Sequence, residues 1–209
     1  SFTAAVSGSY YGRLITKADN DGRICSVPVD KNVGVETWWD LGIGDSTAIW
    51  FAQRVGEEIH LIDYYETSGE SLAHYADKLE EKDYAYERHI APHDIQAREL
   101  GTGKSRLEVA NELGIDFEVA PKLEIDHGIE SVRNILPNCY FDRVKCKIGI
   151  DALRQYRKQW DDKNQVFKNK PLHDWCSHAA DAIRYGAVHD PIDMSEWKKP
   201  IKLDTRYIV

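Results

Sequence analysis

Two aspartates stand where strand-like runs of the sequence end. Asp40 follows the apolar, β-prone start of "TWWDLGIGDSTAIWF" (residues 37–51), just before a glycine-rich turn. Asp94 closes "ERHIAPHD" (residues 87–94), a second run with strand character. Because a strand in a sheet holds its last side chain rigidly at the sheet's edge, both positions suit groups that do chemistry.

A third set of polar groups belongs to a helix near the end of the sequence. The stretch "HDWCSHAADAIRYGAVHD" (residues 173–190) has helical periodicity. Asp174, His178 and Asp181 share one face of it at about 3.6 residues per turn. The neighbouring face is apolar and is expected to dock on a sheet. The polar stripe beside that face would then point to the sheet's edge, where the two strand-end acids are expected.

Convergence of Asp40, Asp94 and Asp181 would bring three like charges together, and burying unpaired carboxylates is costly. Divalent cations that prefer oxygen ligands, Mg²⁺ or Mn²⁺, resolve this repulsion. Two such ions about 4 Å apart can activate a water molecule and stabilise the leaving oxygen of a phosphodiester. The residue types therefore favour a site for divalent metal ions, which would explain an acid at the end of an apolar strand.

Each acid also has a purely structural interpretation, which the sequence leaves open. Asp40 would cap the glycine turn, and Asp94 would cap the segment that follows it. Asp181 would pair with Arg184, three residues further along the helix. The metal site is favoured by the three acids together with the order of the elements that carry them.

The elements that would position these side chains are a mixed set of strands and helices. Three strand-like runs with short connections come first, which implies antiparallel hairpins. Helices and strands then alternate. The expected strands cover residues 35–41, 46–54, 58–65, 87–94 and 116–121, and the expected helices cover residues 70–82, 103–114, 124–136, 152–160 and 173–190. The pattern predicts a mixed α/β fold, with a central sheet flanked by helices.

Length and composition fit a single globular domain with flanking segments. The 209 residues are 42% hydrophobic and 30% charged. We expect a linker over residues 1–34, the domain over 35–190 and an extended tail over 191–209. The sequence opens without methionine, which indicates a fragment of a longer protein. No apolar run reaches the ~20 residues of a membrane helix and no signal peptide is apparent, so no membrane partner is expected. The four scattered cysteines suggest free thiols in a reducing compartment.

Charge is spread unevenly along the chain. The net charge of −8 argues against a broad nucleic-acid surface, yet residues 143–170 hold nine Lys and Arg against three Asp. This segment is either a solvated helix and hairpin or a local contact for a phosphate backbone. Arg98, Lys104 and Arg106 form a second candidate DNA contact. The sequence "GTGKS" among them is not a P-loop, because Arg98 stands where that motif needs its first glycine.

In combination, these motifs resemble the nuclease domain of the large terminase subunit, the DNA-packaging motor of tailed double-stranded DNA phages. The resemblance rests on "WWDLGIGDSTAI" (38–49), "APHD" (91–94) and "HDWCSHAADAIRY" (173–185). The opening "SFTAAVSGSYYGRLI" (1–15) resembles the segment that joins this family's ATPase domain to its nuclease. The order of elements resembles the ribonuclease H-like fold.

The resemblance implies a two-metal endonuclease that cuts double-stranded DNA during concatemer cleavage in viral genome packaging. It assigns Asp40, Asp94 and Asp181 as ligands of two Mg²⁺ or Mn²⁺ ions. It matches His178 to a histidine of some members, which either bonds a ligand or the leaving group or orients a neighbour. Asp174 is left as an accessory group.

Two further acids, Asp45 and Glu70, are not assigned as metal ligands. Asp45 lies on the turn after Asp40 and is expected to face solvent. Ribonuclease H itself carries another acid on its first helix. Glu70 begins the corresponding helix here, without a secure match.

By the same resemblance, the partners are double-stranded DNA, an ATPase domain of the same full-length protein, the small terminase subunit and the portal, in the host cytoplasm. Other interpretations stay open. An actin-like ATPase lobe would share the Asp-Leu-Gly turn, but it needs a second lobe and an adenosine motif that this sequence lacks. A resolvase or transposase would apply the same chemistry to other DNA. A non-catalytic docking module would use the fold only to bind a partner.

Overall fold

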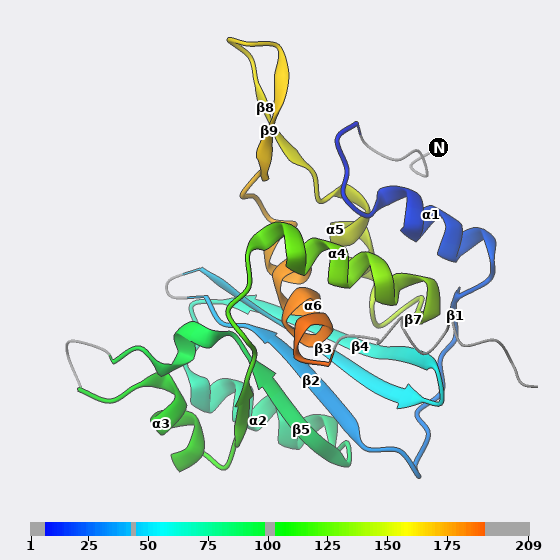
Figure 1. Cartoon of the computed structure of the whole chain (residues 1–209). Coiled ribbons are helices and arrows are strands. Elements are labelled where there is room, and N and C mark those ends of the chain that lie inside the picture. The colour runs from blue at the N-terminus through cyan, green and yellow to red at the C-terminus, as the bar shows by residue number, and fades with distance from the viewer. Residues whose placement is uncertain (1–6, 43–44, 99–102, 191–209) are drawn as a thin grey trace, which may run out of the picture.

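Three apolar strands form the centre of a seven-stranded sheet in the computed structural model (Figure 1). The structure describes residues 7–42, 45–98 and 103–190. The central strands pair antiparallel and are β2 (Val35–Asp40), β3 (Ser46–Val55) and β4 (Glu58–Ser68). Their Trp- and Ile-rich sequences suit a sheet covered on both faces. The three antiparallel strands expected from the sequence are confirmed.

Shorter strands extend this centre on both sides through parallel pairing. They are β1 (Ile24–Cys25), β5 (Tyr86–Ala91), β6 (Phe117–Val119) and β7 (Cys139–Asp142). The order across the sheet is β1-β7-β4-β3-β2-β5-β6. Since β3 is antiparallel to β2 and β4, while β5 is parallel to β2, the carboxyl ends of β2, β4 and β5 lie at one edge.

Helices cover both faces of the sheet, which confirms the predicted mixed α/β architecture (Figure 1). One face packs against α1 (Gly12–Asn20), α4 (Ile125–Ile135), α5 (Lys147–Gln155) and α6 (Ser177–His189). The other face packs against α2 (Leu72–Lys82) and α3 (Arg106–Glu112). The buried side chains accordingly fall into two clusters, one on each side of the sheet.

Helix α6 lies very close to the central strands. A Cβ atom added at Gly186 would meet the Trp38 ring at 2.0 Å, so glycine is what permits this approach. Trp50 anchors the other end of the helix by donating from Nε1 to the Ala179 carbonyl at 2.9 Å. These contacts fix where the polar residues at the start of α6 lie relative to the end of β2.

The largest difference from the sequence prediction concerns residues 152–160, which were expected to be helical. Helix α5 ends at Gln155, and the chain then enters the hairpin of β8 (Lys158–Asp161) and β9 (Val166–Pro171). Tyr156 leaves the helix in a non-helical conformation and is buried, with its ring stacked on Tyr11 at 5.6 Å. Tertiary burial of this tyrosine therefore overrides the local helical pattern.

Residues 7–34, within the expected linker, contribute to the same fold. Ile15 and Ala18 of α1 are buried in the core, and β1 extends the sheet beside β7. The expected tail, residues 191–209, lies outside the described residues. Across the described ranges, the helices are all too short or too polar to cross a membrane.

Candidate active site

Asp40 is the last residue of β2 and lies at the sheet edge where the carboxyl ends meet. The tryptophans before it, Trp38 and Trp39, are fully buried, so the strand is firmly anchored. Asp40 itself keeps 19% of its side chain exposed, and its Oδ2 lies 3.3 Å from Nδ1 of His178. The structure thus brings together the strand-end acid and the helix histidine that the sequence singled out.

His178 lies in the first turn of α6, and only 8% of its side chain is exposed. Its hydrogen bond to Asp40 raises the pKa of the imidazole, burial opposes this, and the charges of Asp40 and Asp45 add to it. Charged carboxylates favour the charged form of a neighbouring histidine. When protonated, this imidazole offsets part of the negative charge of the edge.

Asp181 follows His178 on the same helix face. Burial raises the pKa of this carboxyl to about 6, Arg184 opposes the rise, and the negative charge of Asp40 adds to it. Arg184 donates from Nη2 to Oδ1 of Asp181 at 2.8 Å, which is the structural pairing considered from the sequence. Asp181 is therefore electrostatically coupled to Asp40 while it is also held by Arg184.

Asp94 lies just beyond β5, in the short 3₁₀ turn His93–Gln96, and 58% of its side chain is exposed. Its closest cation is Arg106, whose Nη2 lies 3.8 Å from Oδ1. Arg106 also donates from Nη1 to the Leu41 carbonyl at 2.8 Å. One guanidinium thus links the segment after β2 to the segment after β5.

The three proposed DNA-contacting cations occupy different environments. Arg106 is buried, with 9% of its surface exposed, and is engaged by Leu41 and Asp94. Arg98 and Lys104 are exposed, and Lys104 pairs with Glu112 at 2.5 Å. The structure therefore places Arg106 beneath the surface and the other two on it.

Asp45 and His173 are candidate site residues that sequence reasoning missed. Asp45 was expected to face solvent, and half of its side chain does, but its carboxylate contacts two imidazoles. Oδ1 lies 3.3 Å from Nε2 of His178, and Oδ2 lies 3.5 Å from Nε2 of His173. The available signal was the five-residue spacing of the two histidines at the start of a helix that was already expected to face this turn.

Glu66 is a further carboxylate on the same face of the sheet. The strand register aligns Asp40 with Ala48 and Ala48 with Glu66, and aligned residues on neighbouring strands project from one face. Tyr64 donates from its hydroxyl to Glu66 at 2.5 Å, and the negative charge of Glu66 raises the pKa of His178. The alternation of side chains between the two faces of β4 would have indicated that Glu66 projects from this face.

Two other acids have local structural partners. Asp174 accepts from the Cys176 backbone amide at 2.9 Å and lies 3.7 Å from Arg157, so it caps the chain where it enters α6. Glu70 precedes α2 and lies 3.7 Å from His74. Neither acid has a recorded contact with Asp40, Asp94 or Asp181.

The donor chemistry at this edge fits a hard divalent cation. Carboxylate oxygens are the ligands that Mg²⁺ and Mn²⁺ prefer, and the raised pKa of Asp181 shows an acid destabilised by burial and by Asp40. In the arrangement described, each acid contacts a basic side chain: Asp40 contacts His178, Asp94 contacts Arg106 and Asp181 contacts Arg184. Within the described ranges, no three His, Cys, Asp or Glu side chains gather closely enough to hold a metal ion.

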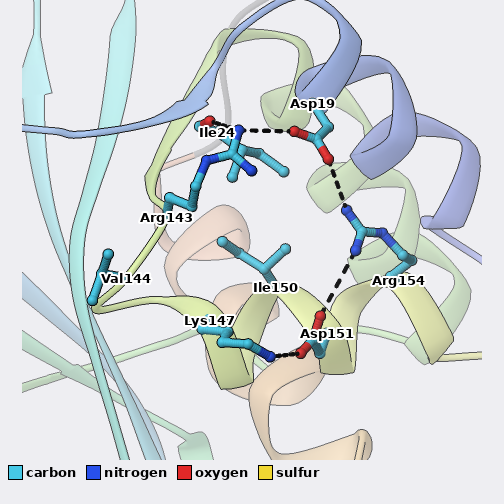
Figure 2. Close-up of a pocket in the computed structure, with 8 residues that line it drawn as sticks. All are labelled: Asp19, Ile24, Arg143, Val144, Lys147, Ile150, Asp151 and Arg154. Atoms are coloured by element: carbon cyan, nitrogen blue, oxygen red, sulfur yellow. Dashed lines mark hydrogen bonds and ion pairs between the residues drawn. The ribbon is translucent and has the colours of Figure 1, made fainter. Parts of the chain in front are cut away.

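A spacious hollow lies elsewhere, between α1 and α5. It has a volume of about 370 Å³ and is lined by Asp19, Ile24, Arg143, Val144, Lys147, Ile150, Asp151 and Arg154 (Figure 2). None of the candidate site residues lines it. We refer to these eight residues as the α1–α5 hollow.

The comparisons with solved structures identify the same architecture in large terminases. The large terminase of a thermophilic bacteriophage, in complex with ADP, superposes with a TM-score of 0.65 at 17% identity, over 83% of this chain and 44% of that one. The nuclease domain of the P22 large terminase matches with a TM-score of 0.61 at 16% identity, over 85% of this chain and 94% of that one. The nuclease domain of the bacteriophage SPP1 large terminase, with bound Mn, matches with a TM-score of 0.55 at 20% identity, over 73% of this chain and 84% of that one.

These likenesses establish the fold. The chain has the ribonuclease H-like fold of large terminase nuclease domains, as the sequence resemblance implied. It spans less than half the length of the ADP-bound terminase and nearly the whole P22 nuclease domain. No protein-family model and no curated protein matches the sequence.

Proposed function

We propose that this chain is a metal-dependent endonuclease that cuts double-stranded DNA, acting in concatemer cleavage during viral genome packaging. The observation that carries the proposal is Asp40, held at the carboxyl end of β2 in contact with His178 and electrostatically coupled to Asp181. The shared fold with large terminase nuclease domains supports the choice of DNA as substrate.

Asp40, Asp94 and Asp181 are the proposed ligands of two divalent ions, Mg²⁺ or Mn²⁺. The bound Mn of the SPP1 nuclease domain supports this class of cation. When bound, two such ions supply an activated water and stabilise the leaving oxygen of the phosphodiester. The chain's own part is to present three carboxylates from a strand, a turn and a helix that are each fixed by packing.

Three protein cations would hold these carboxylates in place before the ions bind. Arg106 ties Asp94 to the backbone after β2, Arg184 holds Asp181, and His178 contacts Asp40. They reduce the repulsion among the acids, since each acid gains an opposite charge nearby. His178 also stands beside Asp40 where it can orient a ligand or a reacting group.

DNA would be held by local basic surfaces, because the chain as a whole carries a net charge of −8. Arg98 and Lys104 are exposed beyond β5, and we propose that they contact the phosphate backbone near Asp94. The β8–β9 hairpin lies within the basic segment 143–170 and leads directly into the start of α6. We propose it as the second contact.

The greater length of the ADP-bound phage terminase, of which this chain covers 44%, supports a further domain in the full-length protein. We propose that an ATPase domain belongs to the same full-length protein, and that the small terminase subunit and the portal deliver the DNA. The protein would then act in the host cytoplasm.

The test is incubation of supercoiled plasmid with the protein and Mn²⁺, with and without a chelator. We expect nicked and linear products with Mn²⁺ and intact plasmid with chelator, with linear duplex cut as readily as branched DNA. Exclusive cutting of branched DNA would favour a resolvase instead. No cutting by wild-type protein, together with tight binding to a partner protein, would replace the nuclease with a docking module.

A further inference from the structure

The imidazole of His178 is contacted at both of its nitrogens. Nδ1 lies 3.3 Å from Oδ2 of Asp40, and Nε2 lies 3.3 Å from Oδ1 of Asp45. One contact leaves an imidazole free to turn about its side-chain bonds, whereas two contacts on opposite sides fix its plane and direction. The second carboxylate therefore determines how the ring faces the first.

Asp45 is itself restrained where it stands. The Ser46 backbone amide donates to its Oδ1 at 2.8 Å. A Cβ atom added at Gly42 would meet the Ser46 carbonyl oxygen at 2.4 Å and the carbonyl carbon of Asp45 at 2.9 Å. Glycine at position 42 thus permits a turn tight enough to bring Asp45 back toward the end of β2.

His173 contacts the other oxygen of Asp45. Its Nε2 lies 3.5 Å from Oδ2, and its ring meets the ring of His178 edge-on at a centroid separation of 6.0 Å. The turn between β2 and β3 is in this way tied to the start of α6 by one carboxylate and two imidazoles. His173 is exposed, so its contribution is expected to be smaller than that of Asp45.

We propose that Asp45 is a positioning residue for the nuclease reaction, which fixes the ring of His178 against Asp40 and is itself held by His173. The inference rests on the proposed function for its catalytic consequence. Groups that orient a ligand or a reacting side chain typically change activity by about 10- to 100-fold when removed. A rival role for Asp45, as a metal ligand in its own right, gives different outcomes below.

The kinetic experiment compares Asp45→Ala, Asp45→Asn, His178→Ala and the double variant Asp45→Ala/His178→Ala, with Mn²⁺ and plasmid. Asp45→Ala should lower kcat by about tenfold and leave KM for DNA within about twofold. Asp45→Asn keeps an oxygen that accepts from the imidazole and should recover most of this loss. The double variant should be no slower than His178→Ala, because Asp45 acts through that ring. Asp77→Ala, at an exposed position of helix α2, is the matched control and should behave as wild type.

The structural experiment follows the ring signals of the histidines by NMR in the metal-free protein. Asp45→Ala should move the signals of His178 strongly, His173→Gln should move them less, and Asp77→Ala should leave them in place. Unmoved His178 signals in Asp45→Ala would overturn the inference. So would additive losses in the double variant, or loss of Mn²⁺ binding in Asp45→Asn, which would make Asp45 a ligand. Inactive wild-type protein would overturn the proposed function and the catalytic consequence, whereas the NMR signals would still decide whether Asp45 holds the ring.

Discussion

The sheet edge and the α1–α5 hollow contain the same kinds of side chain in different balance. In the hollow, Asp19 and Asp151 alternate with cations around the apolar side chains of Ile24 and Ile150 (Figure 2). Asp19 pairs with Arg143 and Arg154, and Asp151 pairs with Arg154 and Lys147. The separations lie between 2.8 and 3.7 Å. Each carboxylate there lies between two permanent cations.

At the edge, carboxylates outnumber the permanent cations that contact them. Arg106 and Arg184 each contact one acid, and the partners of Asp40 and Asp45 are imidazoles. An imidazole loses its charge near neutral pH, whereas a guanidinium keeps it. The hollow, with three permanent cations for its two carboxylates, has no surplus negative charge to attract a cation. An edge with surplus carboxylate has a reason to bind an external cation.

Removing one carboxylate from each region should have very different effects on catalysis. Asp40→Asn should lower plasmid cleavage by at least about 100-fold, because metal-ion stabilisation of the transition state is worth several kcal/mol. Asp151→Asn should stay within about twofold of wild type. Single-turnover cleavage at saturating Mn²⁺ measures both. Equal losses of cleavage activity in the two variants would show that the edge is no more important for catalysis than the hollow.

Two glycines, one in α6 and one in α5, allow the packing of the helix at the edge to be compared with that of the helix at the hollow. Gly186 and Gly149 each pack directly against the central strands, and an added Cβ would meet Trp38 at 2.0 Å and Trp50 at 2.4 Å, respectively. Alanine at either position should lower the free energy of unfolding by about 1–3 kcal/mol, since overpacking forces side chains to shift. Urea denaturation measures this.

The two variants should differ at the edge. Gly186→Ala displaces α6, which carries His178 and Asp181, and should also weaken Mn²⁺ binding. Gly149→Ala displaces α5, which lines the hollow, and should weaken Mn²⁺ binding less, because α5 carries none of the proposed ligands. The opposite result would mean that α6 does not set the geometry of the edge.

A histidine outside both regions, His89, is expected to make the stability of the protein depend on pH. Burial lowers the pKa of His89 to about 4, and its Nδ1 lies 2.6 Å from the Thr37 hydroxyl. Because the unfolded state takes up its proton near pH 6.5 and the folded state near 4, stability should fall as pH drops through this window. The loss should be about 3 kcal/mol and should be absent in His89→Gln. An unchanged acid slope in that variant would assign the effect to other groups.

DNA affinity should show the smallest single-site effects. Arg98→Ala and Lys104→Ala should each reduce the slope of log affinity against log salt by about 0.9 if each side chain contacts one phosphate. Arg143→Ala and Lys147→Ala should change it less, because these cations line the hollow and not the sheet edge where DNA is proposed to bind. Fluorescence anisotropy across a salt series measures the slopes. A larger change in the second pair would place DNA over the hollow.

The central strands and α6 were predictable because their signals are local. Trp38, Trp39, Trp50 and Phe51 form continuous apolar runs, and the helix has clear periodicity around its buried alanines. Short strands carry no such signal. Strand β7 has four residues and pairs with β4 about eighty residues earlier, so tertiary context determines it. The same applies to Tyr156, whose burial ends α5.

Asp40 and Asp94 were named as candidate ligands because each lies at the end of a strand-like run, and Asp181 because it lies on a polar helix face; their role as ligands stays a prediction. Partners distant in the chain gave no such signal. Asp45 was expected in solvent, because its contact with His178 spans 133 positions of the chain and needs the turn at Gly42. Arg106 was expected on the surface, yet its guanidinium reaches back beneath the sheet edge to Leu41.

Whether the surplus carboxylates of the edge bind divalent cations can be seen by X-ray diffraction from crystals soaked in Mn²⁺, with manganese located by its anomalous signal. We expect manganese coordinated by carboxylate oxygens of Asp40, Asp94 and Asp181. Manganese absent from the edge at saturating concentration, or found instead among Asp19 and Asp151 of the hollow, would contradict this expectation.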